Sequence, residues 1–214
     1  MPSLHARALL FDLDGVLVDS TAAIGRTWRG WAETNGIDAE ALLRVVHGRR
    51  AIDTIREVAP HLDAEHETFA LATLEATDTD GVVRAPGAGV LCALPAERWA
   101  IVTSGVRAVA LARLGAASLP EPPVLVPAED IARGKPDPQG YLAGAERLGV
   151  APEDCVVFED APAGVAAARA AGMRCVAVRT THPADALSDA TWQAASLEDV
   201  RITVVEDGFV IERR

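Results

Sequence analysis

The sequence predicts an α/β fold: a doubly wound parallel sheet core with an inserted helical cap domain. Over most of the chain, short apolar runs alternate with amphipathic helical patterns. This alternation is typical of buried parallel strands that are joined by crossover helices. Between residues 19 and 81 the alternation stops, and only helical patterns are found. We therefore expect a core formed by residues 1–18 and 82–214, with residues 19–81 as a helical cap domain.

Five apolar runs are expected to form the strands of the sheet. The first, Ala8–Asp12, is bounded by Gly15, and the second, Trp99–Thr103, ends just before Ser104. The other three runs are Val124–Val126, Cys155–Glu159 and Arg174–Val178. Because the runs are continuously apolar rather than alternating, they indicate strands that are covered on both faces.

Three helical patterns lie between these strands, and each is followed by a glycine. They are Val106–Leu114 before Gly115, Gln139–Leu148 before Gly149, and Pro162–Ala171 before Gly172. Glycine just past the end of a pattern, and proline near its start, are ordinary helix boundaries. The segment Arg201–Ile211 alternates around Asp207-Gly208 and predicts a hairpin.

The cap segment, residues 19–81, carries four helical patterns and no convincing strand. They are Thr21–Asn35, Ala39–Val46 with Asp38 as its N-cap and Gly48 as its stop, Ile52–Ala59, and a fourth that starts near Asp63. An all-helical insert directly after the first strand is typical of a lid that excludes water from a site.

The composition indicates a globular protein with an acidic surface. Half of the 214 residues are hydrophobic and 24% are charged. A net charge of −11 argues against nucleic acid or an anionic membrane as the main partner. No apolar run approaches the roughly 20 residues that span a bilayer. The N-terminus lacks a signal-peptide pattern, and the three cysteines have no ligand-like spacing, so we expect a cytoplasmic protein.

Polar side chains gather where the predicted strands and their loops end. In open α/β sheets, ligands bind at the carboxyl ends of the strands. One of these side chains, Lys135, is the only lysine among 20 basic residues. The full set is Asp12, Asp14, Thr103, Ser104, Lys135, Glu159 and Asp160.

These residue types together predict phosphate chemistry. Carboxylates from two strand ends repel one another unless a cation holds them, and carboxylates with open water positions suit Mg²⁺. A hydroxyl, a glycine-flanked backbone and a lysine opposite that metal would cradle a phosphate. Two carboxylates that lie two residues apart can divide the work, one as nucleophile and the other as general acid and base.

Four segments carry a resemblance to a known family. They are Phe11–Ser20, Thr103–Gly105, Gly134–Pro138 and Phe158–Val165. In order and spacing they resemble the four motifs of the haloacid dehalogenase-like hydrolase superfamily, over nearly the whole chain. The resemblance implies a Rossmann-like core with a cap inserted after the first motif. The cap sequence His47–Ile55 is similar to phosphatases of glycerol phosphate, 2-deoxyglucose 6-phosphate and other sugar phosphates.

The resemblance implies a role for each matching residue. Asp12 is the nucleophile that becomes an aspartyl phosphate, and Asp14 protonates the leaving alkoxide and then activates water. Thr103, Ser104 and Lys135 hold the phosphoryl oxygens. Magnesium is expected on Asp12, Asp160 and the main-chain carbonyl of Asp14, with Glu159 supporting it through water. In the cap, His47, Arg49 and Arg50 are expected to select the leaving group.

The expected function is therefore Mg²⁺-dependent hydrolysis of small polyol or sugar phosphates. The main alternative is a β-phosphoglucomutase-type reaction, but mutases carry a cap histidine where this chain has Ile24. Dehalogenation is disfavoured because Asp14 is present, and phosphonate cleavage because the cap contains no lysine. A phospho-accepting receiver module and a silent phosphometabolite-binding relative also stay open. The expected partner is a small phosphorylated metabolite, bound by a monomer or weak dimer.

Overall fold

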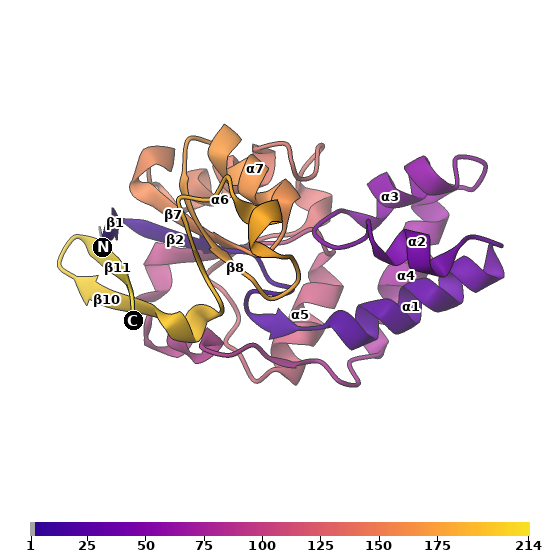
Figure 1. The fold of residues 1–214 in the computed structure, drawn as a ribbon, viewed down its shortest axis with the longest axis horizontal. Helices are drawn as coiled ribbons and strands as arrows, with labels where there is room; N and C mark the ends of the chain where they lie inside the picture. Colours follow the sequence, from indigo (N-terminus) through magenta and orange to yellow (C-terminus); the bar gives the residue numbers. More distant parts are fainter. Residues whose placement is uncertain (1–2) are drawn as a thin grey trace.

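The computed structural model describes residues 3–214 and contains a six-stranded parallel sheet (Figure 1). The spatial order is β6-β5-β2-β7-β8-β9, so the first strand of the sheet in sequence lies near its centre. The strands are β2 (Ala8–Phe11), β5 (Trp99–Val102), β6 (Val124–Val126), β7 (Cys155–Glu159), β8 (Arg174–Val178) and β9 (Trp192–Ala194). This arrangement confirms the predicted α/β class.

Helices cover both faces of the sheet, which is why its strands are apolar throughout. In β2, Leu9 and Phe11 belong to one hydrophobic cluster, while Ala8 and Leu10 belong to the other. Helix α5 (Arg107–Ala116) packs with the first cluster, and α6 (Gln139–Leu148) and α7 (Pro162–Ala170) pack with the second. Side chains that alternate between two buried faces produce the continuous apolar runs of the sequence.

The C-terminal hairpin forms as the sequence predicts. Strands β10 (Val200–Val205) and β11 (Gly208–Arg213) pair antiparallel, and β1 (Leu4–Ala6) extends the same small sheet. Gly208 has a φ of 146°, and a Cβ there would lie 2.0 Å from the carbonyl oxygen of Ala6. Only glycine fits this close approach of two backbones.

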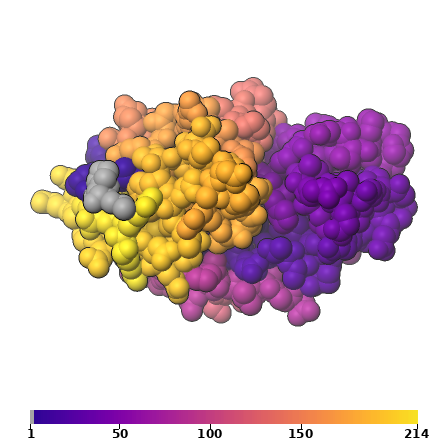
Figure 2. All heavy atoms as spheres, in the orientation of Figure 1, coloured from indigo at the N-terminus to yellow at the C-terminus, as the bar shows by residue number. Residues whose placement is uncertain are grey.

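The cap segment folds into helices with a hydrophobic cluster of their own. They are α1 (Thr21–Thr34), α2 (Ala39–Leu43), α3 (Ala51–Val58) and α4 (Ala64–Thr77). Within this cluster, the rings of Trp28 and Trp31 pack edge to face, with their centroids 5.6 Å apart. Figure 2 shows these helices as an indigo-to-purple lobe beside the sheet-bearing lobe. The cap segment is flanked by two short strands, β3 (Val18–Asp19) and β4 (Val83–Arg84), which pair antiparallel with each other.

Three sequence expectations about local structure are wrong. Helix α5 continues through Gly115, because the chain reverses only at Ser118, where φ is 52°. Helix α2 ends at Leu43 rather than Val46, which frees the chain to bring Gly48 against Ala161 of the core. The sheet also has a sixth, edge strand, β9, whose three residues form no apolar run.

None of the helices in residues 3–214 is both long and apolar enough to span a membrane. Short 3₁₀ helices form several of the remaining connections. The 3₁₀ helices are Ala88–Ala93, Ala96–Arg98, Ala128–Asp130, Pro152–Asp154, Ala184–Leu187 and Leu197–Asp199.

Candidate active site

The carboxyl ends of β2, β5 and β7, together with the loop before α6, bring five of the predicted site residues to one edge of the sheet. All five residues of this group are buried, with no more than 9% of any residue exposed. They are Asp12, Thr103, Lys135, Glu159 and Asp160. Asp12 follows β2, Thr103 follows β5, and Glu159 closes β7, so parallel pairing of the three strands places them side by side.

Lys135 is the charged centre of this group. Its Nζ lies 2.7 Å from Asp12 Oδ1 and 2.6 Å from Glu159 Oε1. Burial alone would lower the pKa of Lys135, but the charges of Asp12 and Glu159 together outweigh it and raise that pKa. The side chain therefore stays an ammonium at neutral pH and can offset negative charge beside Asp12.

Three carboxylates around this lysine could hold a metal ion. Asp12, Glu159 and Asp160 each place one oxygen within 4.8 Å of the others. Burial raises the pKa of Asp12 to about 7, although Lys135 opposes the shift. Burial also raises the pKa of Asp160, and the charges of Glu159 and Asp12 add to this effect. A divalent cation would relieve this repulsion between the carboxylates.

The hydrogen bonds show which carboxylate oxygens of this cluster are free to bind a metal ion. Both oxygens of Glu159 are used: Oε1 accepts from Lys135 and from Tyr141 at 2.8 Å, and Oε2 accepts from the amides of Asp160 and Ala161. Asp12 Oδ2 and Asp160 Oδ1, by contrast, accept no hydrogen bond from residues 3–214. This donor set of hard, unshared carboxylate oxygens fits Mg²⁺.

Two glycines lie against these carboxylates at positions where a Cβ atom would overlap with them. A Cβ on Gly164 would lie 1.6 Å from Glu159 Oε1, and a Cβ on Gly15 would lie 2.1 Å from Asp160 Oδ2. Gly15 also has a φ of 79°, which side-chain-bearing residues rarely adopt. Both glycines therefore belong to the architecture of the site.

Asp14 lies outside the carboxylate cluster and faces the cap segment. Its Oδ1 accepts from Ser20 Oγ at 2.5 Å, and its Oδ2 accepts from Arg113 Nη1 at 2.7 Å. Arg113 Nη2 lies 3.4 Å from Glu75 Oε2 on helix α4. Burial raises the pKa of Glu75, while the charge of Arg113 acts against this. Arg113 thus joins Asp14 to the cap segment.

The sequence analysis missed Ser20, Arg113 and Glu75. One signal for Arg113 was present, because it lies on the same helical stripe as Val109 and Ala110, which are both buried. A charge at a core position of an amphipathic helix indicates a buried partner. Glu75 gave no such signal, because the polar and apolar residues of α4 are not separated onto two faces.

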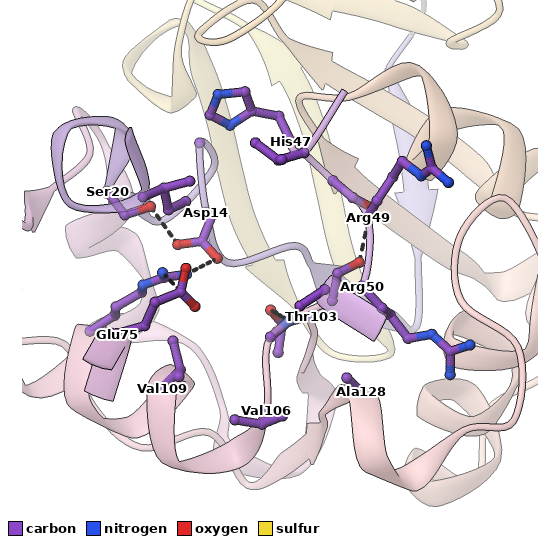
Figure 3. Close-up of a pocket in the computed structure, with 18 of the residues that line it drawn as sticks. Asp14, Ser20, His47, Arg49, Arg50, Glu75, Thr103, Val106, Val109 and Ala128 are labelled. Atoms are coloured by element: carbon purple, nitrogen blue, oxygen red, sulfur yellow. Dashed lines mark hydrogen bonds and ion pairs between the residues drawn. The ribbon is translucent and has the colours of Figure 1, made fainter. Parts of the chain in front are cut away.

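A cavity that is open to solvent lies between the sheet edge and the cap segment. Figure 3 shows Asp14, Ser20 and Glu75 on one side of it, and Arg49 and Arg50 on the other. The sequence-predicted residues that line it are Asp12, Asp14, His47, Arg49, Arg50, Thr103, Ser104 and Asp160. Polar groups that converge beside apolar side chains in one cavity are typical of a site for a small ligand.

The cap loop at residues 47–50 is fastened to the core. Ser104 Oγ donates to the carbonyl oxygen of Gly48 at 2.9 Å. The guanidinium of Arg50, which is almost fully buried, binds Asp53 through two nitrogens. It also donates to the carbonyl oxygens of Ile131 and Ala132, in the core loop that leads to Lys135.

Removal of the Arg50 side chain is expected to destabilise the protein. Arg50→Ala leaves two core carbonyls and Asp53 without their donor, at a cost of about 2–3 kcal/mol. This corresponds to a fall in melting temperature of roughly 4–12 °C. The matched control is Arg49→Ala, since Arg49 pairs with Glu57 near the surface, and we expect a change within about 0.5 kcal/mol. Equal melting temperatures for the two variants would contradict the fastening role of Arg50.

Comparisons with known proteins show the family and the fold of this chain. A model of the haloacid dehalogenase-like hydrolase family matches residues 6–172. Hexitol phosphatase A of Escherichia coli strain K12 is 42% identical over 97% of this chain and 99% of its own. Glycerol-1-phosphate phosphohydrolase 2 of Saccharomyces cerevisiae is 36% identical, over 87% of this chain and 80% of its own. The crystal structure of a hydrolase from Pseudomonas syringae has the same fold, with a TM-score of 0.81 at 24% identity over 90% of this chain and 94% of its own.

Proposed function

The chain belongs to the haloacid dehalogenase-like hydrolase family and is a phosphatase, and from this premise we propose that it hydrolyses phosphate monoesters of small polyols or sugars. The observation that carries the proposal is the contact of Asp12, which lines the cavity, with the buried Lys135. Asp12 has one oxygen oriented by the ammonium and one unshared, so one can attack phosphorus while the other binds the metal.

The reaction proposed for this site has two steps. Asp12 attacks the phosphorus atom, the ester oxygen leaves, and Asp14 gives that oxygen its proton. Asp14 then takes a proton from water, which attacks the aspartyl phosphate and releases inorganic phosphate. The bonds from Ser20 and Arg113 hold Asp14 in one orientation at the cavity wall.

Phosphate binding is proposed for Thr103, Ser104 and Lys135. Lys135 supplies the charge, and Thr103 supplies a buried hydroxyl next to the glycine-flanked turn. Ser104 uses its hydroxyl to bind Gly48 of the cap loop, so we assign its main-chain N–H to the phosphate. Fixed donors of this kind stabilise the charge of a transferring phosphoryl group.

We propose that Asp12, Asp160 and the main-chain carbonyl of Asp14 hold Mg²⁺. Bound there, the metal would neutralise charge on the phosphoryl oxygens. Because both oxygens of Glu159 are already shared with protein donors, this residue would support the metal indirectly, through water.

We further propose that residues 19–81 act as the cap that closes over the bound ester, and that His47, Arg49 and Arg50 of its loop contribute to leaving-group selection. The chain would act on free metabolites in the cytoplasm, as a monomer or weak dimer. The mutase alternative has less support: Ile24 lines the cavity, and the curated relatives described above are phosphatases.

The test of this function is phosphate release from a panel of esters, with Mg²⁺ and with a chelator. The panel holds glycerol 1-phosphate, a hexitol phosphate, 2-deoxyglucose 6-phosphate, phosphoglycolate and β-glucose 1-phosphate. We expect release from polyol or hexose esters that chelation abolishes and added Mg²⁺ restores. Conversion of β-glucose 1-phosphate to glucose 6-phosphate, with little phosphate release, would instead establish the mutase.

A further inference from the structure

The cationic side chains that line the cavity are already neutralised by carboxylates. Arg113 pairs with Asp14 and lies near Glu75. The other guanidiniums pair within the cap segment, as Arg49–Glu57 and Arg50–Asp53. Burial lowers the pKa of His47, which leaves its ring neutral at pH 7. Within residues 3–214, the cap side of this cavity thus presents no uncompensated positive charge.

Helix α4 adds an acceptor to the same wall. Glu75 lines the cavity, and its side chain is 16% exposed. Its Oε2 lies near Arg113, whereas its Oε1 has no partner among the described residues. Two turns earlier on the same helix, Thr68 also lines the cavity, and its Oγ1 lacks a hydrogen-bond partner within the described chain. These are the polar residues that α4 contributes to the lining, and Ala72 lies between them in the sequence.

The apolar part of this wall comes from both lobes. Ile24 and Trp28 of α1, Ile52 of α3 and Ala72 of α4 line the cavity from the cap segment. Val106 and Val109 line it from the core (Figure 3). Such a wall suits the C–H groups of a carbon chain, while an unshared carboxylate oxygen accepts hydrogen bonds from hydroxyl groups.

We propose that Glu75 is a specificity-determining residue that accepts a hydrogen bond from a hydroxyl group of the leaving alcohol and repels leaving groups that carry a second negative charge. This inference rests on the proposed function and narrows it to esters of neutral polyhydroxy alcohols. A carboxylate or a second phosphate on the leaving group would meet the negative charge of Glu75 with no free cation to balance it.

The experiment compares three esters with carbon chains of equal length. Glycerol 1-phosphate carries two hydroxyl groups, propyl phosphate carries none, and 3-phosphoglycerate has a carboxylate in place of one hydroxymethyl group. For the wild-type protein, we expect kcat/KM for glycerol 1-phosphate to exceed that for either other ester by at least about 10-fold, the effect of a hydrogen bond to a charged group.

The decisive variant is Glu75→Gln, which keeps the size of the side chain and removes its charge. The preference for glycerol 1-phosphate over 3-phosphoglycerate is expected to fall roughly 10-fold, because the repulsion is gone. The preference over propyl phosphate is also expected to fall. Glu65→Gln is the matched control, since Glu65 lies on the exposed side of α4 and pairs with Arg56. It should leave both ratios unchanged.

The ratios separate this role from an indirect one. If Glu75 acted only through Arg113 and Asp14, Glu75→Gln would lower kcat/KM for all three esters by a common factor, and the inference would be overturned. Equal wild-type activity on the three esters would overturn it as well, while leaving a phosphatase in place. No phosphate release from any of these esters or from the wider panel would overturn the proposed function, and this inference with it.

Discussion

Replacement of Asp12 by asparagine is expected to reduce phosphate release by a factor on the order of 10⁴ or more, because a carboxamide has no anionic oxygen to attack phosphorus. The change is nearly isosteric, so the second contact of Lys135, to Glu159, is expected to remain. We therefore expect binding of inorganic phosphate to survive while turnover is lost.

Two measurements check this result. The first is steady-state phosphate release from the preferred ester. The second is acid-quenched labelling with a radiolabelled ester, which should leave a hydroxylamine-sensitive phosphoryl group on the wild-type chain and none on Asp12→Asn. A melting temperature within a few degrees of wild type shows that the variant is folded. Substantial turnover by such a folded variant would exclude Asp12 as the nucleophile.

Substitution of Lys135 is expected to give the second-largest loss of phosphatase activity. The ammonium lies between two carboxylates in a space where its side chain is only 5% exposed, and Tyr141 lies beside it, with its ring centroid 5.3 Å from Nζ. Lys135→Ala leaves Asp12 and Glu159 uncompensated, and removal of one partner of a buried pair costs about 3–5 kcal/mol. That cost is in folding stability; because the ammonium no longer offsets charge on the transferring phosphoryl group, we also expect a rate loss of roughly 10³-fold.

The informative variant is Lys135→Arg, which keeps the charge. A planar guanidinium needs more room than a compact ammonium, and it cannot place a single nitrogen at both short distances without displacing Tyr141 or Asp12. We expect it to lose nearly as much activity as Lys135→Ala. Arg133→Lys is the matched control, because Arg133 is exposed on the same loop. If Lys135→Arg were fully active, the requirement for a compact charge would be refuted.

The core of the site could be predicted from the sequence because it follows from topology. Asp12, Thr103 and Glu159 each stand at the end of an apolar run, and parallel strands bring such ends to one edge. Strands β2, β5 and β6 could be located in the sequence because they contain no polar residue. The solitary Lys135 drew attention only against an otherwise arginine-only background.

The contacts of the cap with the core could not be predicted in the same way. Arg50 binds main-chain carbonyls, and a carbonyl has no residue type that would mark it in a sequence. Glu75 and Arg113 meet only because α4 packs against α5, which depends on how the two lobes are oriented. Edge strand β9 escaped notice because two of its three side chains are only half-buried.

The single lysine makes the active site separately observable by spectroscopy. Growth on lysine enriched with ¹⁵N at the ζ position would label one side chain, and that nitrogen contacts both Asp12 and Glu159. Burial of the ammonium in two short ion pairs slows exchange of its protons with water, so they can be observed through the attached nitrogen. One resonance, obtained without mutation, would report phosphate entry, metal binding and phosphorylation of the neighbouring carboxylate.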